Sequence, residues 1–499
     1  MSKRIPLEYL KNYLWDSAVL LRTHIDAGSY KQYIFPLLFF KRISDVYDEE
    51  NATALKEYGD EDALNFPENH RFALPTGFHW RDVRETHENV GVAIVNAFRA
   101  IERANAEKLS GVFGDGAWTN KKRLPDELLK DLMEHFSSLE LSIENCPEDE
   151  LGQGYEYLIR KFADDSGHTA QEFYTNRTVV HLMTEMLKPQ PNEAIYDPTC
   201  GSAGMLISAI AYLKKQKKEW RNVKIYGQEI NALTASIARM NLFLHGVKDF
   251  QITNDDTLTK PAFIENGQLK RFDLVLANPP YSISQWNKDA FARDKYGRNF
   301  LGTPPQGRAD YAFFQHILKS LHPQTGRCAI LFPHGILFRT EESAMREKLI
   351  KNDLIDCVIG LGANLFFNSP MEACIVLCRS SKEIARRGKI LIINAVREVA
   401  RRNAQSYLDD EHLRKIAEAY AGYADIEGFA RVITIAEAEK NNFSLSIPLY
   451  VRSAANAEAL EESKPLAKHL QAWSESRVKM RASFEALTAM LQVKGNNDD

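Results

Sequence analysis

Seven short apolar runs alternate with amphipathic stretches in the middle of this chain, and this alternation limits the folds that are open to it. The runs cover residues 193–197, 223–229, 250–253, 272–277, 328–333, 354–361 and 373–379. Short apolar strands separated by helices are typical of a parallel sheet that carries helices on both faces. The sequence therefore predicts an α/β fold with a doubly wound, mainly parallel seven-stranded sheet.

The regions on either side of this sheet show helical patterns. Between residues 1 and 160, apolar residues recur at spacings of three and four, which predicts an all-helical N-terminal domain. After residue 400 the chain becomes charged and helical again, and its end carries an apolar stripe that includes Leu466, Trp473 and Leu487. We expect an α/β domain at 161–400 and a helical C-terminal region at 401–499, whose last helix folds back on its own core or docks on a partner.

The composition argues against a protein that holds a nucleic acid duplex alone. The formal net charge is -4, whereas such proteins usually carry a strong basic excess. The six cysteines occur singly, without a CxxC pair or a histidine cluster, so we expect buried, reduced thiols and no metal site. No apolar run approaches the ~20 residues that span a bilayer, and the first residues lack the apolar core of a signal peptide. We therefore expect a cytoplasmic protein without membrane contact.

The first predicted strand runs into a glycine-containing turn, YDPTCGSAG at 196–204. Gly201 and Gly204 allow a tight turn, and Ser202 and Ala203 are small enough to leave it open, so the backbone can approach a nucleotide-like ligand closely. Asp197 precedes the glycines, and a carboxylate there suits a ligand that carries positive charge. The alternative is a tight strand-to-helix turn without a ligand.

The next two predicted strands also end in acidic residues. Glu229 stands at the end of the second strand, where an acid can accept hydrogen bonds from the hydroxyl groups of a ribose. Asp256 follows the third strand, where it can accept from the exocyclic amine of a bound adenine. Each acid alone is more often a solvated loop residue, but their regular placement at one edge of the sheet favours a shared binding crevice.

The fourth predicted strand ends in Asn278, Pro279, Pro280 and Tyr281. An aromatic amino group attacks a methyl donor poorly, because its lone pair is delocalised into the ring. If the Asn278 side-chain carbonyl and the Pro279 backbone carbonyl accept the two N–H hydrogens, the lone pair is directed toward the donor. Proline fixes the backbone, and Tyr281 offers a ring on which a planar base can stack. We predict that these four residues form the catalytic site.

These motifs, in this order, resemble those of the N6-adenine DNA methyltransferases that use S-adenosyl-L-methionine. The segment AQEFYTNRTVVHLM at 170–183 is similar to a block that precedes the glycine turn in that family. The segments KQYIFPLLFFKRISD, ADYAFFQHIL, FPHGILFR and NLFFNSPMEACIVL are similar to the modification subunit of type I restriction-modification systems. The resemblance extends from about Leu7 to beyond Cys378.

The resemblance implies S-adenosyl-L-methionine as the cofactor and assigns residues to it and to the target base. The cofactor residues would be Glu172, Phe173, Tyr174, Thr175, Asn176, Arg177, Ser202, Ala203, Gly204 and Glu229, with Asp197, Gly201 and Asp256 beside them. Asn278, Pro279 and Tyr281 would hold a flipped adenine, with 161–400 as the catalytic domain. Asn176 stands where the family usually has a proline, and we expect it to loosen this loop.

The resemblance also implies partners. These are duplex DNA, a separate specificity subunit that binds two copies of this chain, and a restriction endonuclease subunit. We expect the N-terminal domain to contact DNA or partners and the C-terminal region to dock on the specificity subunit. The basic segments 213–218 and 292–298 are candidates for phosphate contacts. Two alternatives remain open: methylation of an RNA base or a protein glutamine, and a non-catalytic DNA-binding subunit.

Overall fold

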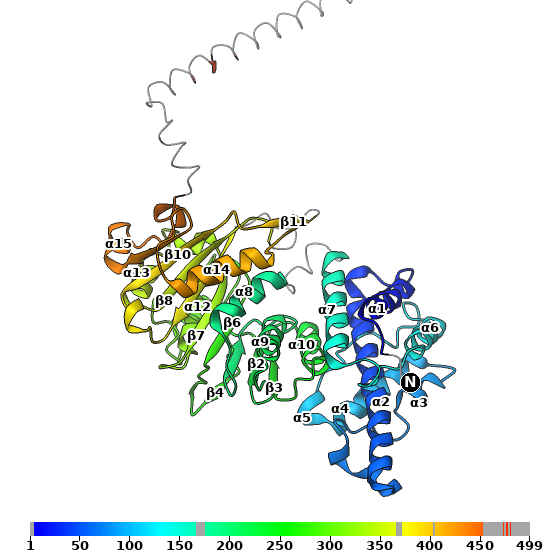
Figure 1. Cartoon of the computed structure of the whole chain (residues 1–499). Coiled ribbons are helices and arrows are strands. Elements are labelled where there is room, and N and C mark those ends of the chain that lie inside the picture. The colour runs from blue at the N-terminus through cyan, green and yellow to red at the C-terminus, as the bar shows by residue number, and fades with distance from the viewer. Residues whose placement is uncertain are drawn as a thin grey trace, which may run out of the picture.

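The computed structural model in Figure 1 describes residues 4–165, 175–365, 372–402 and 405–452, together with Trp473, Ser476, Arg477 and Met480. A helical domain is followed along the chain by a domain built on one large sheet. Among the described residues, no helix has both the length and the apolar character needed to cross a membrane.

The prediction of an all-helical N-terminal domain is confirmed. Its α-helices are α1 (Leu7–Leu21), α2 (Lys31–Tyr58), α3 (Trp80–Arg84), α4 (Val90–Ala104), α5 (Ala106–Leu109), α6 (Asp126–Ser137) and α7 (Glu148–Asp165). The long helix α2 runs through the middle of this domain (Figure 1). Its apolar segment from Tyr33 to Phe40 is almost completely buried, because helices α1, α4, α6 and α7 pack around it.

The second domain contains a mixed sheet of nine strands in the order β13-β10-β8-β9-β7-β6-β1-β2-β3. Its strands are β1 (Ala194–Asp197), β2 (Lys224–Glu229), β3 (Phe250–Asn254), β6 (Leu274–Ala277), β7 (Arg327–Pro333), β8 (Ile355–Leu361), β9 (Ala373–Arg379), β10 (Lys389–Ala395) and β13 (Ala430–Thr434). Strands β9 and β13 run antiparallel to their neighbours, and the other pairings are parallel. Two small hairpins, β4 (Ile264–Glu265) with β5 (Gln268–Leu269) and β11 (Ala400–Arg402) with β12 (Gln405–Tyr407), lie outside it.

Helices cover both faces of the sheet, as a doubly wound fold requires. Their bounds are α8 (Arg177–Leu187), α9 (Gly204–Lys215), α10 (Ala232–Leu244), α11 (Lys288–Ala292), α12 (Asp310–Lys319), α13 (Ser343–Lys351), α14 (Asp410–Gly422) and α15 (Ile435–Lys440). Helices α8, α9, α10 and α14 contribute to the apolar core on one face, and α12, α13 and α15 to the core on the other. The predicted fold class is therefore confirmed.

All seven predicted strands are present, each within two residues of its expected bounds, but the sheet is wider than predicted. Strand β10 pairs in parallel with β8, and β13 pairs with β10 at the edge of the sheet. The region 401–452 is therefore not purely helical, because it includes β12 and β13 as well as α14 and α15. Of the predicted apolar stripe near the C-terminus, Trp473 is described and largely exposed, and the other members lie outside the described residues.

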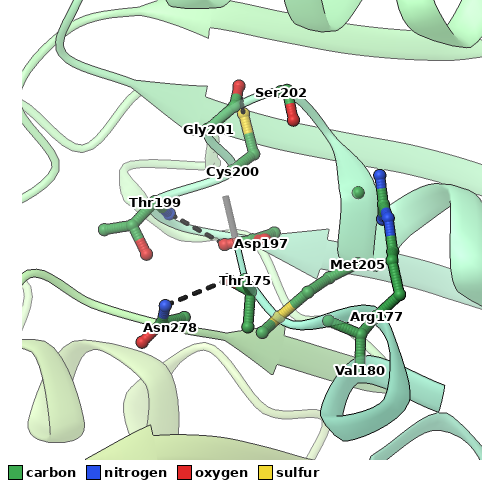
Figure 2. A pocket seen from close by; sticks show the side chains of 11 residues that line it. Thr175, Arg177, Val180, Asp197, Thr199, Cys200, Gly201, Ser202, Met205 and Asn278 are labelled. Carbon is green, nitrogen blue, oxygen red and sulfur yellow. Dashed lines mark hydrogen bonds between the residues drawn. The ribbon is translucent and has the colours of Figure 1, made fainter. Parts of the chain in front are cut away.

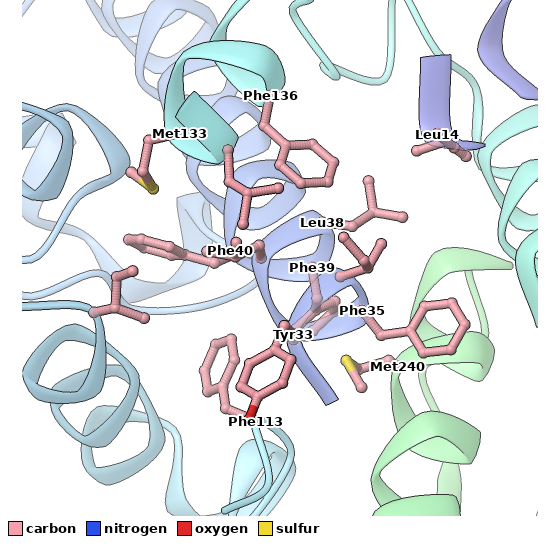
Figure 3. Close-up of a cluster of buried hydrophobic side chains, with 14 of the residues drawn as sticks. Leu14, Tyr33, Phe35, Leu38, Phe39, Phe40, Phe113, Met133, Phe136 and Met240 are labelled. Carbon is pink, nitrogen blue, oxygen red and sulfur yellow. The ribbon is translucent and has the colours of Figure 1, made fainter. Parts of the chain in front are cut away.

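Helix α10 belongs to the apolar cores of both domains. Ile237, Met240 and Leu244 pack into the helical domain, whereas Ala235 and Leu242 pack against the sheet. Figure 3 shows Met240 of α10 facing Phe35 of α2 within the cluster of aromatic and aliphatic side chains. The Ser236 hydroxyl and the Arg239 guanidinium add hydrogen bonds to the backbone carbonyls of the 110–111 turn. The two domains are joined by a shared helix as well as by the polypeptide.

A buried carboxylate fastens α14 to the sheet. Asp356 of β8 is completely buried, and its Oδ2 atom accepts hydrogen bonds from the Tyr420 hydroxyl at 2.6 Å and from the guanidinium groups of Arg379 and Arg386, each at 3.1 Å. Burying a carboxylate is favourable only when such partners compensate its lost hydration. The Tyr423 hydroxyl donates to the Asp356 backbone carbonyl at 3.0 Å and adds a second contact between the two elements.

We expect Tyr420→Phe to lower the free energy of unfolding by about 1.5–3 kcal/mol, because Asp356 loses a charge-assisted hydrogen bond. Urea denaturation measures this change. Tyr58→Phe is the control: Tyr58 is 57% exposed, so its substitution should change the free energy of unfolding by no more than about 0.5 kcal/mol. Equal stability of the two variants would show that the Tyr420 hydroxyl does not brace α14.

Candidate active site

The turn after β1 is folded tightly enough to need unusual backbone angles. Gly201 has φ +51° and Ala203 has φ +66°, a left-handed conformation that costs energy for a residue with a side chain. The turn is held from two sides: the Cys200 amide donates to the Gln228 carbonyl at 3.0 Å, and the Asn241 side chain donates to the Ser202 carbonyl at 2.8 Å. The strand-to-helix turn predicted from the glycines is therefore present and firmly anchored.

Asp197, at the end of β1, is a buried acid. Asp197 is only 2% exposed, and its Oδ1 atom accepts a hydrogen bond from the Thr199 amide at 3.0 Å. Burial raises the pKa of Asp197 to about 8, and the nearby Glu229 carboxylate acts in the same direction. The carboxyl group is thus largely neutral in the free protein at neutral pH, and a cationic ligand favours its ionised form.

Thr175 and Asn176 lie directly before α8, and Arg177 is its first residue. The Asn176 Oδ1 accepts from the Thr178 amide at 3.0 Å, and its Nδ2 donates to the Ser406 carbonyl at 3.2 Å. Asn176 is therefore an N-cap of α8, which stabilises the helix end. The expectation that asparagine in the proline position loosens this loop stays a prediction, although the Asn176 side chain hydrogen-bonds both the start of α8 and the Ser406 carbonyl.

Arg177 lies against the glycine turn and reaches the helical domain. Its Nη2 donates to Glu156 Oε1 of α7 at 2.5 Å. A Cβ built on Gly204 would lie 2.3 Å from Arg177 Nη1. A side chain at position 204 would therefore require the Arg177 guanidinium group to move.

The Asn278 side chain is fixed at one end and unsatisfied at the other. Its Nδ2 donates to Thr175 Oγ1 at 3.0 Å, whereas its Oδ1 is buried and has no hydrogen-bond partner among the described residues. Beyond it, Pro279 is buried and Pro280 is exposed. A buried amide oxygen without a partner is costly, so this atom is a candidate to accept a hydrogen bond from a substrate.

The segment after Tyr281 is held by an ion pair. Ser282 has φ +51°, and its amide donates to Asp310 Oδ1 at 3.0 Å. The other oxygen of Asp310 pairs with Arg339 at 3.0 Å, and Asp310 is almost completely buried. The end of the Asn-Pro-Pro-Tyr segment is therefore held by Asp310 of α12, which is itself paired with Arg339 of the segment after β7.

One pocket joins these three loops, with an empty volume of about 400 Å³ that includes open solvent. Figure 2 shows Asp197, Thr175 and Asn278 facing it from different segments. Seven predicted site residues line the pocket: Thr175, Arg177, Asp197, Gly201, Ser202, Gly204 and Asn278. Ala203 lies within the turn but does not line the pocket. It also includes four residues that were not predicted: Val180, Thr199, Cys200 and Met205.

The other predicted residues lie elsewhere. Asn176, Glu229, Asp256, Pro279, Pro280 and Tyr281 do not line this pocket, and Glu172, Phe173 and Tyr174 lie outside the described residues. The Glu229 carboxylate accepts hydrogen bonds from the amides of Gly201 and Asn231, at 3.0 and 2.9 Å, so it helps to hold the glycine turn in place. Asp256 accepts from the Leu258 amide at 2.9 Å.

Sequence patterns gave little signal for the additional residues. Thr199 and Cys200 are within the quoted turn, but Val180 and Met205 are ordinary apolar residues of helices.

Ile230 directly follows Glu229 and is 69% exposed, which is unusual for a large aliphatic side chain at the end of a buried strand. An exposed aliphatic residue there offers an apolar surface to a planar ring.

The basic segment 292–298 is only partly available for phosphates. Arg298 is 3% exposed and pairs with Asp294, while its guanidinium donates to the carbonyls of Thr257 and Leu258. Arg298 therefore ties the segment after α11 to the loop after β3. Arg293 and Lys295 are exposed. In the segment 213–218, Lys214 pairs with Asp149 of α7 at 2.6 Å.

Comparison with known families agrees with this geometry. Residues 147–459 match the family model described as N-6 DNA Methylase, and residues 10–136 match the HsdM N-terminal domain. The methylase subunit of the type I restriction enzyme MjaVIII of Methanocaldococcus jannaschii is 30% identical, covering 90% of this chain and 79% of that protein. The HindI methylase subunit of Haemophilus influenzae is 32% identical, covering 76% of this chain and 87% of that protein.

A solved structure shares the whole architecture. The type I restriction-modification methyltransferase subunit from Streptococcus thermophilus superposes with a TM-score of 0.79 at 30% sequence identity, covering 90% of this chain and all of that one. The two matched family models together cover both domains described above. This chain belongs to the N-6 DNA methylase family, as an adenine-specific methylase subunit of a type I restriction-modification system.

Proposed function

We propose that this chain transfers a methyl group from S-adenosyl-L-methionine, bound in the pocket between β1 and β6, to N6 of an adenine flipped out of duplex DNA. The observation that carries the proposal is the Asn278 amide: its nitrogen is held by Thr175, and its buried oxygen has no partner among the described residues. Asn278 lines the pocket that also contains Asp197 and the glycine turn.

The residues of the pocket fit this cofactor. S-adenosyl-L-methionine supplies an electrophilic methyl group on a positively charged sulfur. Asp197 offers a buried carboxyl group to a cationic part of the ligand, and the small residues Gly201, Ser202 and Gly204 let the backbone approach it closely.

Asn278 and Pro279 act on the target amine. The Asn278 Oδ1 atom and the Pro279 carbonyl oxygen would each accept a hydrogen bond from one N6 hydrogen. The nitrogen lone pair would then be directed into the pocket. Proline limits the backbone angles that would move these acceptors. Tyr281, which is half-buried, would stack on the base, and flipping the base costs a few kcal/mol of lost pairing and stacking.

Glu229, Ile230 and Asp256 would hold the nucleoside end of the cofactor. The Glu229 carboxylate accepts hydrogen bonds from the Gly201 and Asn231 amides, and an acid at the end of β2 suits the hydroxyl groups of a ribose. Ile230 would cover one face of the adenine ring, and Asp256 would accept from its amino group.

We further propose that the chain acts with partners. The matched relatives are named as subunits of restriction enzymes, and a net charge of -4 is a poor basis for holding duplex DNA alone. A specificity subunit that binds two copies of this chain would read the DNA sequence, and an endonuclease subunit would complete the system. The helical domain and the region after residue 400 are the surfaces for these contacts.

The two alternatives from the sequence have less support. Methylation of RNA or glutamine is not favoured, because the matched relatives are methylases of restriction enzymes. A non-catalytic subunit would have no need for Asp197 and Asn278 beside one pocket.

Co-expression of this chain with its specificity subunit tests the proposal directly. Host DNA should carry N6-methyladenine at one recurring sequence, mapped by single-molecule sequencing. DNA from cells that express this chain without the specificity subunit is the control. Absence of methylated adenine from both samples, with both proteins folded and S-adenosyl-L-methionine bound, would contradict adenine as the substrate.

We expect Asn278→Ala to lower the single-turnover methylation rate at least ~100-fold, because one of two acceptors for the amine is lost. Binding of S-adenosyl-L-methionine, measured by calorimetry, should stay within about 3-fold of the wild type, because the loss affects the target base and not the cofactor. Asn352→Ala, at an exposed position after α13, is the matched control and should leave the rate unchanged. Retained methylation in Asn278→Ala would contradict the assigned role.

We expect the affinity for S-adenosyl-L-methionine to rise with pH and to level off above about 8. The pKa of Asp197 is raised to about 8 in the free protein, so below this pH the carboxyl must release a proton before it can stabilise a cation. The affinity should rise by up to about tenfold per pH unit below the pKa. Calorimetry across this pH range measures the change, and Asp197→Asn should flatten it. A wild-type affinity without this pH dependence would exclude Asp197 as the partner of the cation.

A further inference from the structure

The hydrogen bond between Thr175 and Asn278 joins two segments that are far apart in the sequence. Thr175 precedes α8, and Asn278 follows β6, 103 residues later. Both residues line the same pocket, and Figure 2 shows the Thr175 hydroxyl beside the Asn278 amide nitrogen. The contact therefore lies where the proposed cofactor pocket meets the proposed site of the target base.

The backbones of both residues are fixed. Asn176 caps α8 and bonds the Ser406 carbonyl, which holds the residue next to Thr175. Asn278 stands between a completely buried strand and the buried Pro279. Two rotations then decide the geometry of the contact: that of the Asn278 amide about its last bond and that of the Thr175 hydroxyl.

The orientation of the amide decides whether Asn278 can act. A side-chain amide has an acceptor end and a donor end of nearly the same shape. If Oδ1 faces the target amine, it accepts an N6 hydrogen. If Nδ2 faces the amine, the N–H groups of Asn278 and of the target amine face each other, no hydrogen bond forms, and the lone pair of N6 is not directed toward the methyl donor. Some neighbour must therefore distinguish the two ends.

A threonine hydroxyl alone cannot make this choice, because it can accept from Nδ2 or donate to Oδ1. The choice is made once its single hydrogen is used elsewhere. If the hydroxyl donates to an acceptor in the pocket, its oxygen can only accept, and the amide end that faces it must be Nδ2.

We propose that Thr175 is a positioning residue that orients the Asn278 amide when the cofactor pocket is filled. Its hydroxyl hydrogen is donated to an acceptor group of the bound cofactor, such as a carboxylate, and its oxygen then accepts from Asn278 Nδ2. The Oδ1 end is thereby fixed toward the target amine. This inference rests on the proposed function. It means that binding of the cofactor in its pocket orients the Asn278 amide for the target base.

Thr175→Val tests the inference in the complex with DNA and the specificity subunit. Valine keeps the shape and removes the hydroxyl, so the single-turnover methylation rate at saturating S-adenosyl-L-methionine should fall about 10- to 100-fold. Thr175→Ser keeps the hydroxyl and should restore the rate. Thr184→Val is the matched control, because the Thr184 hydroxyl is buried in α8, the helix that follows Thr175, and bonds the Val180 carbonyl and Ser208.

Calorimetric affinity for S-adenosyl-L-methionine separates orientation from simple cofactor contact. A Thr175→Val defect that disappears at saturating cofactor would reduce Thr175 to a binding contact and overturn the inference. A rate equal to that of the wild type would overturn it as well. A wild-type complex that binds the cofactor but methylates no adenine would instead contradict the proposed function.

The variant Asn278→Asp provides a second test. A carboxylate has two acceptor ends, so its orientation no longer matters. The rate lost through Thr175→Val should then shrink to within about 3-fold in the Asn278→Asp background, a coupling that a double-mutant cycle measures. An equal loss in both backgrounds would show that Thr175 acts by another route.

Discussion

The parallel pairing of β1 with β6 is the constraint on which the site depends. The chain runs from β1 to β2 and β3 on one side and then crosses to β6 and β7 on the other. At this reversal, Asp197 leaves β1 and Asn278 leaves β6 at the same edge of the sheet, and their loops diverge to opposite faces. Open α/β sheets bind ligands at such a switch point because the diverging loops leave a crevice. The pocket lies in this crevice.

The sequence predicts most of the sheet because its strands are buried on both faces. Such strands appear as continuous apolar runs bounded by polar turns, and β6, β7 and β8 are completely buried. The edge strand β13 has alternating exposed and buried residues within a charged region, so its short pattern resembles that of the neighbouring helices. Edge strands depend on pairing with a neighbour, which one sequence does not reveal.

The site divides in the same way. Asp197, Gly201, Gly204 and Asn278 were predictable because backbone geometry and chemistry demand those residue types close to strand ends. The contact of Asn278 with Thr175 was not, since it depends on how α8 packs beside β6. The cap at Asn176 and the buried ion pair of Arg298 with Asp294 were missed for the same reason. A side chain's partner across the fold is a tertiary property.

The membership of α10 in two cores limits how the molecule can be divided. A fragment that began after α7 would leave Ile237, Met240 and Leu244 of α10 in contact with water. Exposing each of these side chains costs about 1.5–3 kcal/mol, a large share of the stability of an ordinary domain. The helical domain therefore cannot be removed without loss of stability. Its removal would expose an apolar surface on α10, close to the glycine turn, that favours aggregation. The smallest autonomous form of this enzyme must keep both halves of the chain.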